Sequence, residues 1–194
     1  MLSAALRCAA PSPVRWAIGL SLALLVAGSA NAAIETIRSV AIVQTSDGYV
    51  ADVVMFAPVP ASIAWDVLTD FDHQAAWVPN VRESKVIARE GNAVTVEQHG
   101  VVKLGLASIP YASVRQQDLD PQRTVRSTQV KGDNTRRLES LMTLRPDDNG
   151  TQLIYHLEWT PAGLAALVVS NDSLERQLRE QFTAIIGEMV RRSR

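Results

Sequence analysis

The chain has 194 residues, 47% of them hydrophobic, which is enough to bury the core of one domain even after loss of a short leader. Its 19 basic and 20 acidic residues nearly balance, which argues against the concentrated positive surface of a nucleic-acid-binding protein. The only cysteine is Cys8, so the chain has no internal disulfide and no cysteine-based metal site.

The N-terminal segment has the pattern of a secretory signal peptide. Arg7 and Arg15 precede an apolar run, Trp16 to Val26, that is too short to span a bilayer as a helix. Ala30 and Ala32 then supply the small-x-small pattern of a cleavage site. A membrane anchor and an organelle transit peptide are the alternatives, because a transit peptide also contains arginine and lacks acidic residues.

We therefore expect an exported protein, periplasmic or secreted, that is cleaved near Ala32. Residues 1–32 are the leader, and residues 33–194 form a single domain of 162 residues. Cleavage removes Cys8 and leaves 17 basic against 20 acidic residues, a net charge near −3. The exported domain is thus expected to have no thiol chemistry and no partner among nucleic acids.

The first part of this domain predicts either a hairpin or a short lead-in followed by the first strand, and then a helix. Two β-branched, apolar runs, Ile34 to Val43 and Tyr49 to Phe56, are separated by the turn sequence Ser46-Asp47-Gly48. Ser62 is the expected N-cap of a helix of about ten residues. One or two further helical turns are expected around residues 73–77.

The central part predicts an antiparallel meander. From Val81 onward the period of the apolar residues changes to two, and short turn sequences separate the runs. Connections this short join antiparallel neighbours, since parallel strands need a long crossover. The expected strands are residues 81–88, 93–104, 108–119, 124–131, 136–144 and 152–159.

The C-terminal segment, Asp172 to Arg192, predicts the longest helix. Five apolar residues recur at spacings of three and four, and at about 100° per residue they fall within an arc of about 80°. They are Leu174, Leu178, Phe182, Ile185 and Met189. Asp172 followed by Glu175 predicts the start of the helix. A helix with one apolar stripe has to pack against another layer, so the expected fold is α+β, with the helix lying across a curved antiparallel sheet.

This order of elements resembles the helix-grip fold of the START-like (SRPBCC) superfamily, which includes polyketide cyclase/dehydrase, lipid-transport and coenzyme Q-binding proteins. The resemblance rests on the stretch from Ala57 to Phe71, on Trp77-Val78-Pro79, on the alternating strand Leu153 to Trp159 and on the closing helix. It extends over about Tyr49 to Arg192. It implies a pocket for an apolar molecule between the sheet and the last helix.

Several side chains are candidates for the wall of such a pocket. Tyr155, Leu157 and Trp159 share the face of their strand that is expected to meet the helix, and two of them combine an apolar body with a polar tip. Trp77 is the candidate for the pocket mouth, and a Trp77→Ala substitution is expected to weaken the binding of an apolar probe. The further candidates are Tyr111, Met142 and Phe182. Ordinary core packing is the alternative for all of them.

The sequence contains no metal-ligand spacing among His73, His99 and His156, and no motif for a cofactor. If the protein is an enzyme, His99, Tyr111 and Tyr155 are its expected acid or base groups, with Glu97 able to orient His99 should that face turn inward. A solvated pair is the alternative for Glu97 and His99.

Three functions remain open from the sequence. The first is a monomeric, non-enzymatic carrier of a lipid-, isoprenoid- or polyketide-like molecule, without cofactor. The second is a polyketide cyclase/dehydrase-like enzyme, and the third is an interaction module with a filled core. Arg191, Arg192 and Arg194 at the helix end suggest transient contact with an anionic membrane, although cations at a helix C-terminus also complement its dipole.

Overall fold

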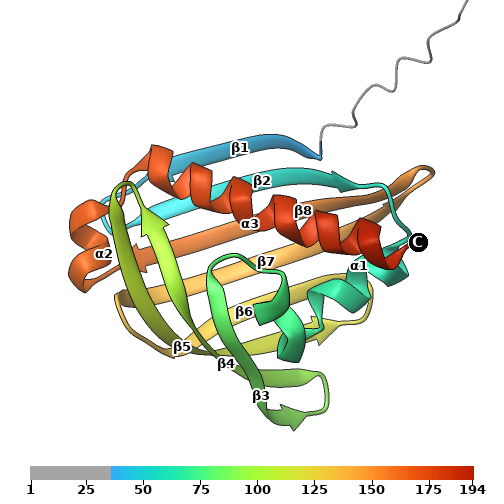
Figure 1. Ribbon diagram of the computed structural model, residues 1–194, viewed down its shortest axis with the longest axis horizontal. Helices are drawn as coiled ribbons and strands as arrows, with labels where there is room; N and C mark the ends of the chain where they lie inside the picture. The colour runs from blue at the N-terminus through green and yellow to red at the C-terminus, as the bar shows by residue number, and fades with distance from the viewer. Residues whose placement is uncertain (1–35) are drawn as a thin grey trace, which may run out of the picture. The chain divides into compact units, whose positions relative to one another are not determined.

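Ile37–Gln44 (β1) and Tyr49–Ala57 (β2) form the hairpin that opens the sheet. The computed structural model describes residues 36–194, so the predicted leader, residues 1–32, lies outside the described residues. On β2 the buried positions alternate from Tyr49 to Met55, which places one face of the hairpin against the rest of the domain (Figure 1).

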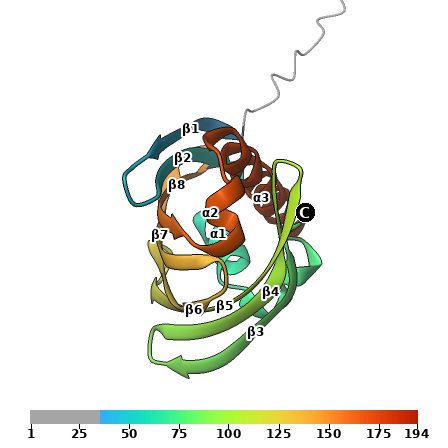
Figure 2. The ribbon, with the colours of Figure 1, turned by 90° about the vertical axis from the view of Figure 1, so that its left-hand side faces the viewer.

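Six further strands continue the sheet as the predicted antiparallel meander. The last of them returns to pair with β2, so the spatial order is β1-β2-β8-β7-β6-β5-β4-β3 in one eight-stranded sheet. The sheet curves around the C-terminal helix, as the end-on view shows (Figure 2). This is the predicted α+β helix-grip fold. The strands are Val81–Glu90 (β3), Ala93–Leu104 (β4), Ala107–Asp120 (β5), Thr124–Gly132 (β6), Thr135–Asp147 (β7) and Gly150–Pro161 (β8).

Two short helices connect β2 to β3. They are Ala61–Leu68 (α1) and the 3-10 helix Phe71–Ala76 (η1). The prediction of Ser62 as N-cap is wrong, because the carbonyl of Pro60 already accepts the first helical hydrogen bond, from the Ala64 N–H at 3.1 Å. Ser62 therefore lies inside the first turn.

Asn171–Arg192 (α3) is the helix that the apolar stripe predicted, and every residue of that stripe is buried. Its expected start signal is wrong. The N-cap is Ser170, whose hydroxyl accepts from the Ser173 N–H at 3.2 Å, while the Ser173 hydroxyl accepts from the Ser170 N–H at 2.9 Å. Serine replaces the usual glutamate in this reciprocal capping box because its hydroxyl reaches back just as well. A further short helix, Gly163–Val168 (α2), precedes α3 and was not predicted.

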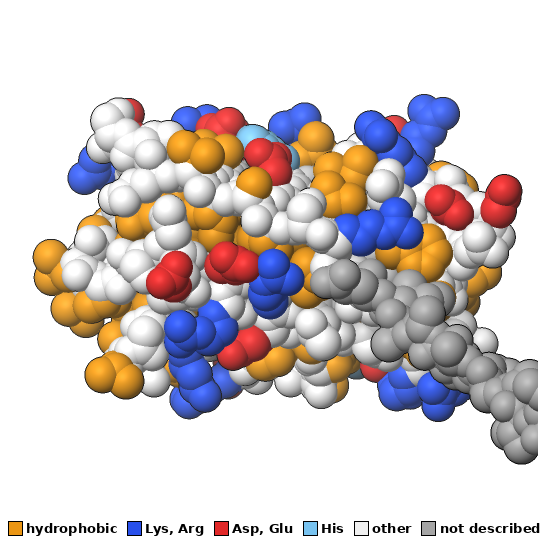
Figure 3. Space-filling view, turned by 90° about the horizontal axis from the view of Figure 1, so that it is seen from above, with side chains coloured by type: hydrophobic (Ala, Val, Ile, Leu, Met, Phe, Trp, Pro, Cys, Tyr) orange, Lys and Arg blue, Asp and Glu red, His pale blue; other side chains and the backbone are white. Residues whose placement is uncertain are grey.

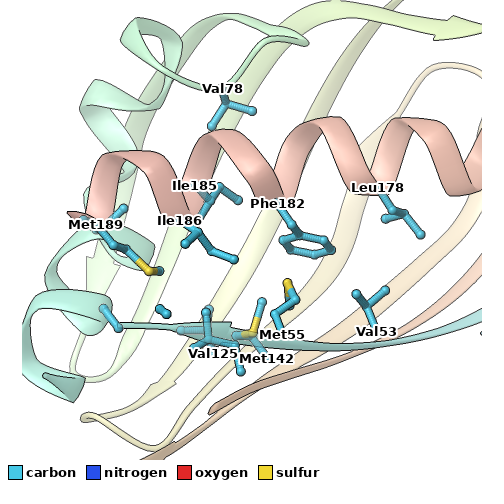
Figure 4. Packing of buried hydrophobic residues seen from close by; sticks show 14 of the residues in the cluster. Val53, Met55, Val78, Val125, Met142, Leu178, Phe182, Ile185, Ile186 and Met189 are labelled. Carbon is cyan, nitrogen blue, oxygen red and sulfur yellow. The ribbon is translucent and has the colours of Figure 1, made fainter. Parts of the chain in front are cut away.

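One side of the C-terminal half of α3 packs on a solid core. Ile186 and Met189 of α3 and Met55 and Leu153 of the sheet are among the largest fully buried side chains (Figure 4). At roughly 1.5–3 kcal/mol for each fully buried large apolar side chain, this cluster fixes the helix on the β1-β2-β8 side of the sheet. Among the described residues no helix is both long and apolar enough to cross a membrane.

An ionic cluster ties the end of α3 to the segment between α1 and η1. The nearly buried carboxylate of Glu188 accepts hydrogen bonds from Arg191 and Arg192, each at 2.6 Å, and Arg192 also donates to Asp70 at 2.6 Å. Hydrogen bonds from Arg191, opposed by burial and reinforced by Arg192, lower the pKa of Glu188 to about 2. Two of the three terminal arginines are thus engaged in ion pairs within the domain.

We expect Glu188→Gln to lower the free energy of unfolding at pH 7 by about 1.5–3 kcal/mol, the range for hydrogen bonds to a charged group. Since the folded-state pKa lies below the ordinary value of 4.5, the carboxylate stabilises the fold above about pH 4.5, and this contribution disappears as the pH falls toward 2. Urea unfolding at pH 7 and pH 3 tests this. The difference between wild type and variant should shrink at pH 3, and exposed Glu180→Gln on the same helix should stay within about 0.5 kcal/mol.

Candidate functional site

The inner face of the sheet changes from apolar to polar across its width. On β2 and β8 the inward positions are mostly aliphatic and aromatic, and they pack under α3. On β4 to β7 the inward positions include polar side chains that are wholly or partly buried. These are Gln98, Ser113, Arg115, Gln117, Ser127 and Ser140. A sheet face that has to hold polar groups cannot be filled by apolar packing alone, which leaves space under this side of α3.

That space consists of two adjoining chambers between α3 and the strands β4 to β8. The outer chamber, of about 140 Å³, has Leu104, Ile109, Leu138, Leu157 and Trp159 in its wall and Leu174 and Leu178 of α3 above them. The inner chamber, of about 130 Å³, lies nearer α1 and is more polar. Gln98, Gln117 and Ser127 in its wall are joined by side-chain hydrogen bonds to each other or to neighbouring residues.

Three side chains line both chambers and stand at the division between them. They are Arg115 on β5, Tyr155 on β8 and Gln181 on α3. The Tyr155 ring meets the edge of the Phe182 ring at a centroid distance of 4.9 Å, which holds it in place. Burial raises the pKa of Tyr155, partly offset by its hydrogen bond with Ser140 and by the charge of Arg115. Its hydroxyl is therefore protonated at neutral pH and can donate a hydrogen bond.

Tyr111 also lines the outer chamber, and Gly100 makes room for it. A Cβ atom at position 100 would clash with the Asn80 carbonyl oxygen and would lie 2.8 Å from the Tyr111 ring, so a larger residue on β4 would disturb both the backbone and the aromatic side chain. Burial raises the pKa of Tyr111, and the nearby charge of Arg115 partly counteracts this. Arg115 thus acts electrostatically on both tyrosines of the cavity.

The end of the outer chamber is held together by Asn134, in the turn between β6 and β7. Its side chain donates to the Pro110 carbonyl of β5 at 3.2 Å and accepts from the Leu164 N–H of α2 at 3.2 Å. Beside it, the Trp159 indole donates to the Thr135 hydroxyl at 3.1 Å. These contacts fix the positions of β5, α2 and the β6–β7 turn around the chamber.

Four exposed hydrophobic side chains at this same end of the domain form an apolar rim. It comprises Leu106 in the β4–β5 turn and Leu164, Leu167 and Val168 on α2, with exposed fractions of 108%, 60%, 80% and 39%. α2 packs on the β4–β5 hairpin through Ala165, Leu104 and Ile109. Hydrophobic side chains accordingly protrude at the left-hand end of the space-filling view, where α2 lies in Figure 1 (Figure 3).

The structure brings most of the sequence-predicted pocket residues to this cavity. Tyr111, Leu157 and Trp159 line the outer chamber, Met142 and Phe182 the inner one, and Tyr155 both.

Two of the candidates lie elsewhere. Trp77 packs against the main core and lines neither chamber. His99 points to the exposed outer face of β4, 3.7 Å from Glu97, so it cannot act inside the cavity. The other histidines pair with aspartates, His73 with Asp70 and His156 with Asp52. In the part of the chain that the structure describes, no cluster of three metal-ligating side chains occurs.

The sequence reasoning missed Arg115 and Ser113. Both lie on the inward face of β5, in line with Ile109, Tyr111 and Leu119. The signal in the sequence was that an arginine shares one face of the strand with aromatic and aliphatic residues. It was obscured because polar residues also occupy the opposite face of β5, so alternation did not distinguish inside from outside.

Comparison with known proteins agrees with this geometry. The sequence profile of the family described as polyketide cyclase/dehydrase and lipid transport matches residues 50–194. No curated protein matches the sequence.

Among solved structures, the Zhui aromatase/cyclase from Streptomyces sp. R1128 is 19% identical, with a TM-score of 0.61, covering 75% of this chain and 95% of its own. The STAR-related lipid transfer protein from Xanthomonas axonopodis is 17% identical, with a TM-score of 0.60, covering 77% and 90%. A START superfamily protein from Mycobacterium smegmatis is 13% identical, with a TM-score of 0.59, covering 74% and 99%. At these identities the likeness concerns the fold alone.

Proposed function

Because the chain belongs to the polyketide cyclase/dehydrase and lipid-transport family, we propose that it binds one hydrophobic molecule in the two chambers beneath α3 and carries it without chemical change. The observation that carries this proposal is the cavity itself, which lies where the sheet face becomes too polar to close against the helix. At roughly 0.8 kcal/mol per buried methylene, ten methylenes contribute about 8 kcal/mol before ordering costs, so apolar contact alone supports measurable binding.

Native mass spectrometry of gently purified protein, followed by solvent extraction, tests the proposal. We expect a co-purified apolar molecule, or saturable binding of the neutral dye Nile red by protein that has lost its cargo. A protein that carries no such molecule and also does not bind the dye would support the filled interaction module instead.

A second candidate function, a cyclase or dehydratase, is favoured by Tyr111 and Tyr155, which line the same chamber as Arg115 and whose pKa values its charge lowers. Because burial raises both pKa values, these phenols would act as hydrogen-bond donors to a substrate carbonyl and not as bases at neutral pH. Turnover of a polyketide-like substrate that is lost in Tyr155→Phe, with Nile red binding retained, would favour this function over the carrier.

We further propose that the ligand enters and leaves through the apolar rim while the rim contacts a membrane. The rim lies beside Leu104, Ile109 and Ala165, which line the outer chamber, so an apolar molecule moving between bilayer and cavity there would not cross water. Exposed Lys103 on β4 and Lys131 on β6 lie at the same end of their strands and suit an anionic surface. This membrane contact replaces the one inferred from the arginines at the end of α3.

Replacing Leu106 and Leu167 together by serine should weaken binding to vesicles of phosphatidylcholine and phosphatidylglycerol by about tenfold or more, since each leucine contributes roughly 1.5–3 kcal/mol when it enters an apolar phase. Vesicle co-sedimentation measures the effect. Ile87→Ser is the matched control, because Ile87 is 49% exposed on β3 and lines neither chamber. Equal loss in the control would contradict a specific role of the rim.

We also propose that the protein is exported and acts as a monomer. Export is supported by the leader pattern of residues 1–32, and N-terminal sequencing of the exported protein should give a sequence that begins near Ala33. A mass in solution equal to one processed chain would support the monomer. An N-terminus that retains Arg7 and Arg15 would contradict the cleavage.

A further inference from the structure

We propose that Arg115 and Ser113 form an anion anchor inside the cavity, so that the ligand is an amphipathic carboxylate and not a purely apolar molecule. This inference rests on the proposed function and specifies its ligand class. It begins from two orphaned polar atoms, Arg115 Nε and Ser113 Oγ, which are buried and have no hydrogen-bond partner among the described residues.

The two atoms belong together. Ser113 and Arg115 are two positions apart on β5, so their side chains leave the same face of the sheet, and both line the outer chamber. The Nε group of Arg115 and the hydroxyl of Ser113 can both donate hydrogen bonds, and neither has a partner among the described residues. A buried donor without an acceptor costs free energy, so the site favours a guest that brings acceptor oxygens.

The charge of the anchor is not balanced from inside the cavity. Among the described residues, Asp133 is the only acidic one that lines either chamber, and it lies exposed in the β6–β7 turn. Within the described residues, Arg115 has no carboxylate within ion-pair distance. Arg137 and Arg192, by contrast, each lie within ion-pair distance of a carboxylate on a neighbouring element. The guanidinium is therefore placed to meet an anion that the domain does not supply.

The neighbours of the anchor set the orientation of the ligand. A carboxylate on Arg115 can accept a second hydrogen bond from the Ser113 hydroxyl, with the protonated phenols of Tyr111 and Tyr155 nearby. Its hydrocarbon part then extends among Leu104, Leu138 and Leu157 of the outer chamber toward the rim. The acid group lies deep and the apolar tail lies toward the mouth. A carboxylate suits the guanidinium fork because both groups are planar.

Three ligands that differ only in the head group test the anchor, namely dodecanoate, dodecanol and methyl dodecanoate, each displacing Nile red at pH 7.5. Wild type should bind dodecanoate roughly 10- to 100-fold more tightly than the methyl ester, the range expected for a hydrogen bond to a charged group in a buried site. Arg115→Gln should remove this preference for the acid over the ester. Ser113→Ala should reduce it by a smaller factor.

Arg126→Gln is the matched control, because Arg126 lies exposed on the opposite face of the neighbouring strand β6. Its replacement changes the net charge by the same amount as Arg115→Gln. It should retain the full preference. If Arg115→Gln does not fold, Arg115→Lys is the alternative variant. It keeps the positive charge but loses the planar guanidinium, so it should keep part of the preference for dodecanoate. Wild type that binds Nile red but does not distinguish acid from ester would overturn the anchor and leave the carrier in place. Protein that binds neither would overturn both.

Discussion

The substitution Ser113→Phe should abolish measurable Nile red binding or weaken it at least about tenfold. A tenfold loss corresponds to about 1.4 kcal/mol of binding free energy. Ser113 is buried, and its side chain faces an outer chamber of about 140 Å³. An aromatic ring in this place would occupy the space in which the proposed ligand lies. Titration of Nile red fluorescence measures the change.

Ser108→Phe supplies the matched control. Ser108 lies on the same strand, but its side chain is exposed on the opposite face, so the same substitution adds the same ring to the surface. It should leave Nile red affinity within about twofold. Small-to-large substitutions in filled cores typically cost 1–3 kcal/mol of stability, so urea unfolding of both variants is needed. A stable Ser113→Phe protein with unchanged Nile red affinity would contradict binding in the outer chamber.

The sequence predicted the fold because its two layers carry different periods. The stripe of α3 repeats at three and four residues, and the strands β4 to β8 repeat at two with short turns between them. Both patterns arise from burial of one face, which the structure confirms. α2 was not predicted because six residues give less than two helical turns, too few for a period to be visible.

The cavity was predicted less completely, and for a physical reason. Pattern reasoning finds apolar residues that share a face, so it found Tyr155, Leu157 and Trp159 on β8. It could not find Arg115, because a cavity wall contains polar residues at positions that a filled core would give to apolar ones. Both faces of β5 carry polar and apolar residues, so the sequence of this strand alone does not show which face points into the domain.

Trp77 illustrates the opposite error. A large aromatic residue beside a proline in a connecting segment suggests a pocket mouth, yet here it closes the core beside η1, and its indole Nε1 is buried without a hydrogen-bond partner among the described residues. In the proposed function the ligand enters instead where β4 meets β5, beside α2, because Leu104, Ile109 and Ala165 line the outer chamber there. The identity of an aromatic residue does not distinguish these positions, because both require a bulky apolar surface.

The helix α3 packs on solid core at Ile186 and covers the outer chamber at Leu178, and this difference predicts unequal stability losses. Ile186 is 2% exposed and lines neither chamber, so Ile186→Ala should leave an unfilled void and cost about 3–5 kcal/mol of unfolding free energy. Leu178 is almost as buried, at 4%, but one side of it already faces the outer chamber. It has fewer packing partners to lose, so Leu178→Ala should cost only about 1–2.5 kcal/mol.

Urea unfolding of ligand-free protein measures both losses, with Leu167→Ala on the exposed rim as a control that should stay within about 0.5 kcal/mol. A bound ligand adds a further difference, because it contacts Leu178 and not Ile186. Saturation with dodecanoate should therefore stabilise Ile186→Ala as much as wild type and Leu178→Ala less. Equal costs for Ile186→Ala and Leu178→Ala in the absence of ligand would mean that the space beneath the first half of α3 closes in solution. A carrier requires that space to remain open or to open at little cost when the ligand arrives.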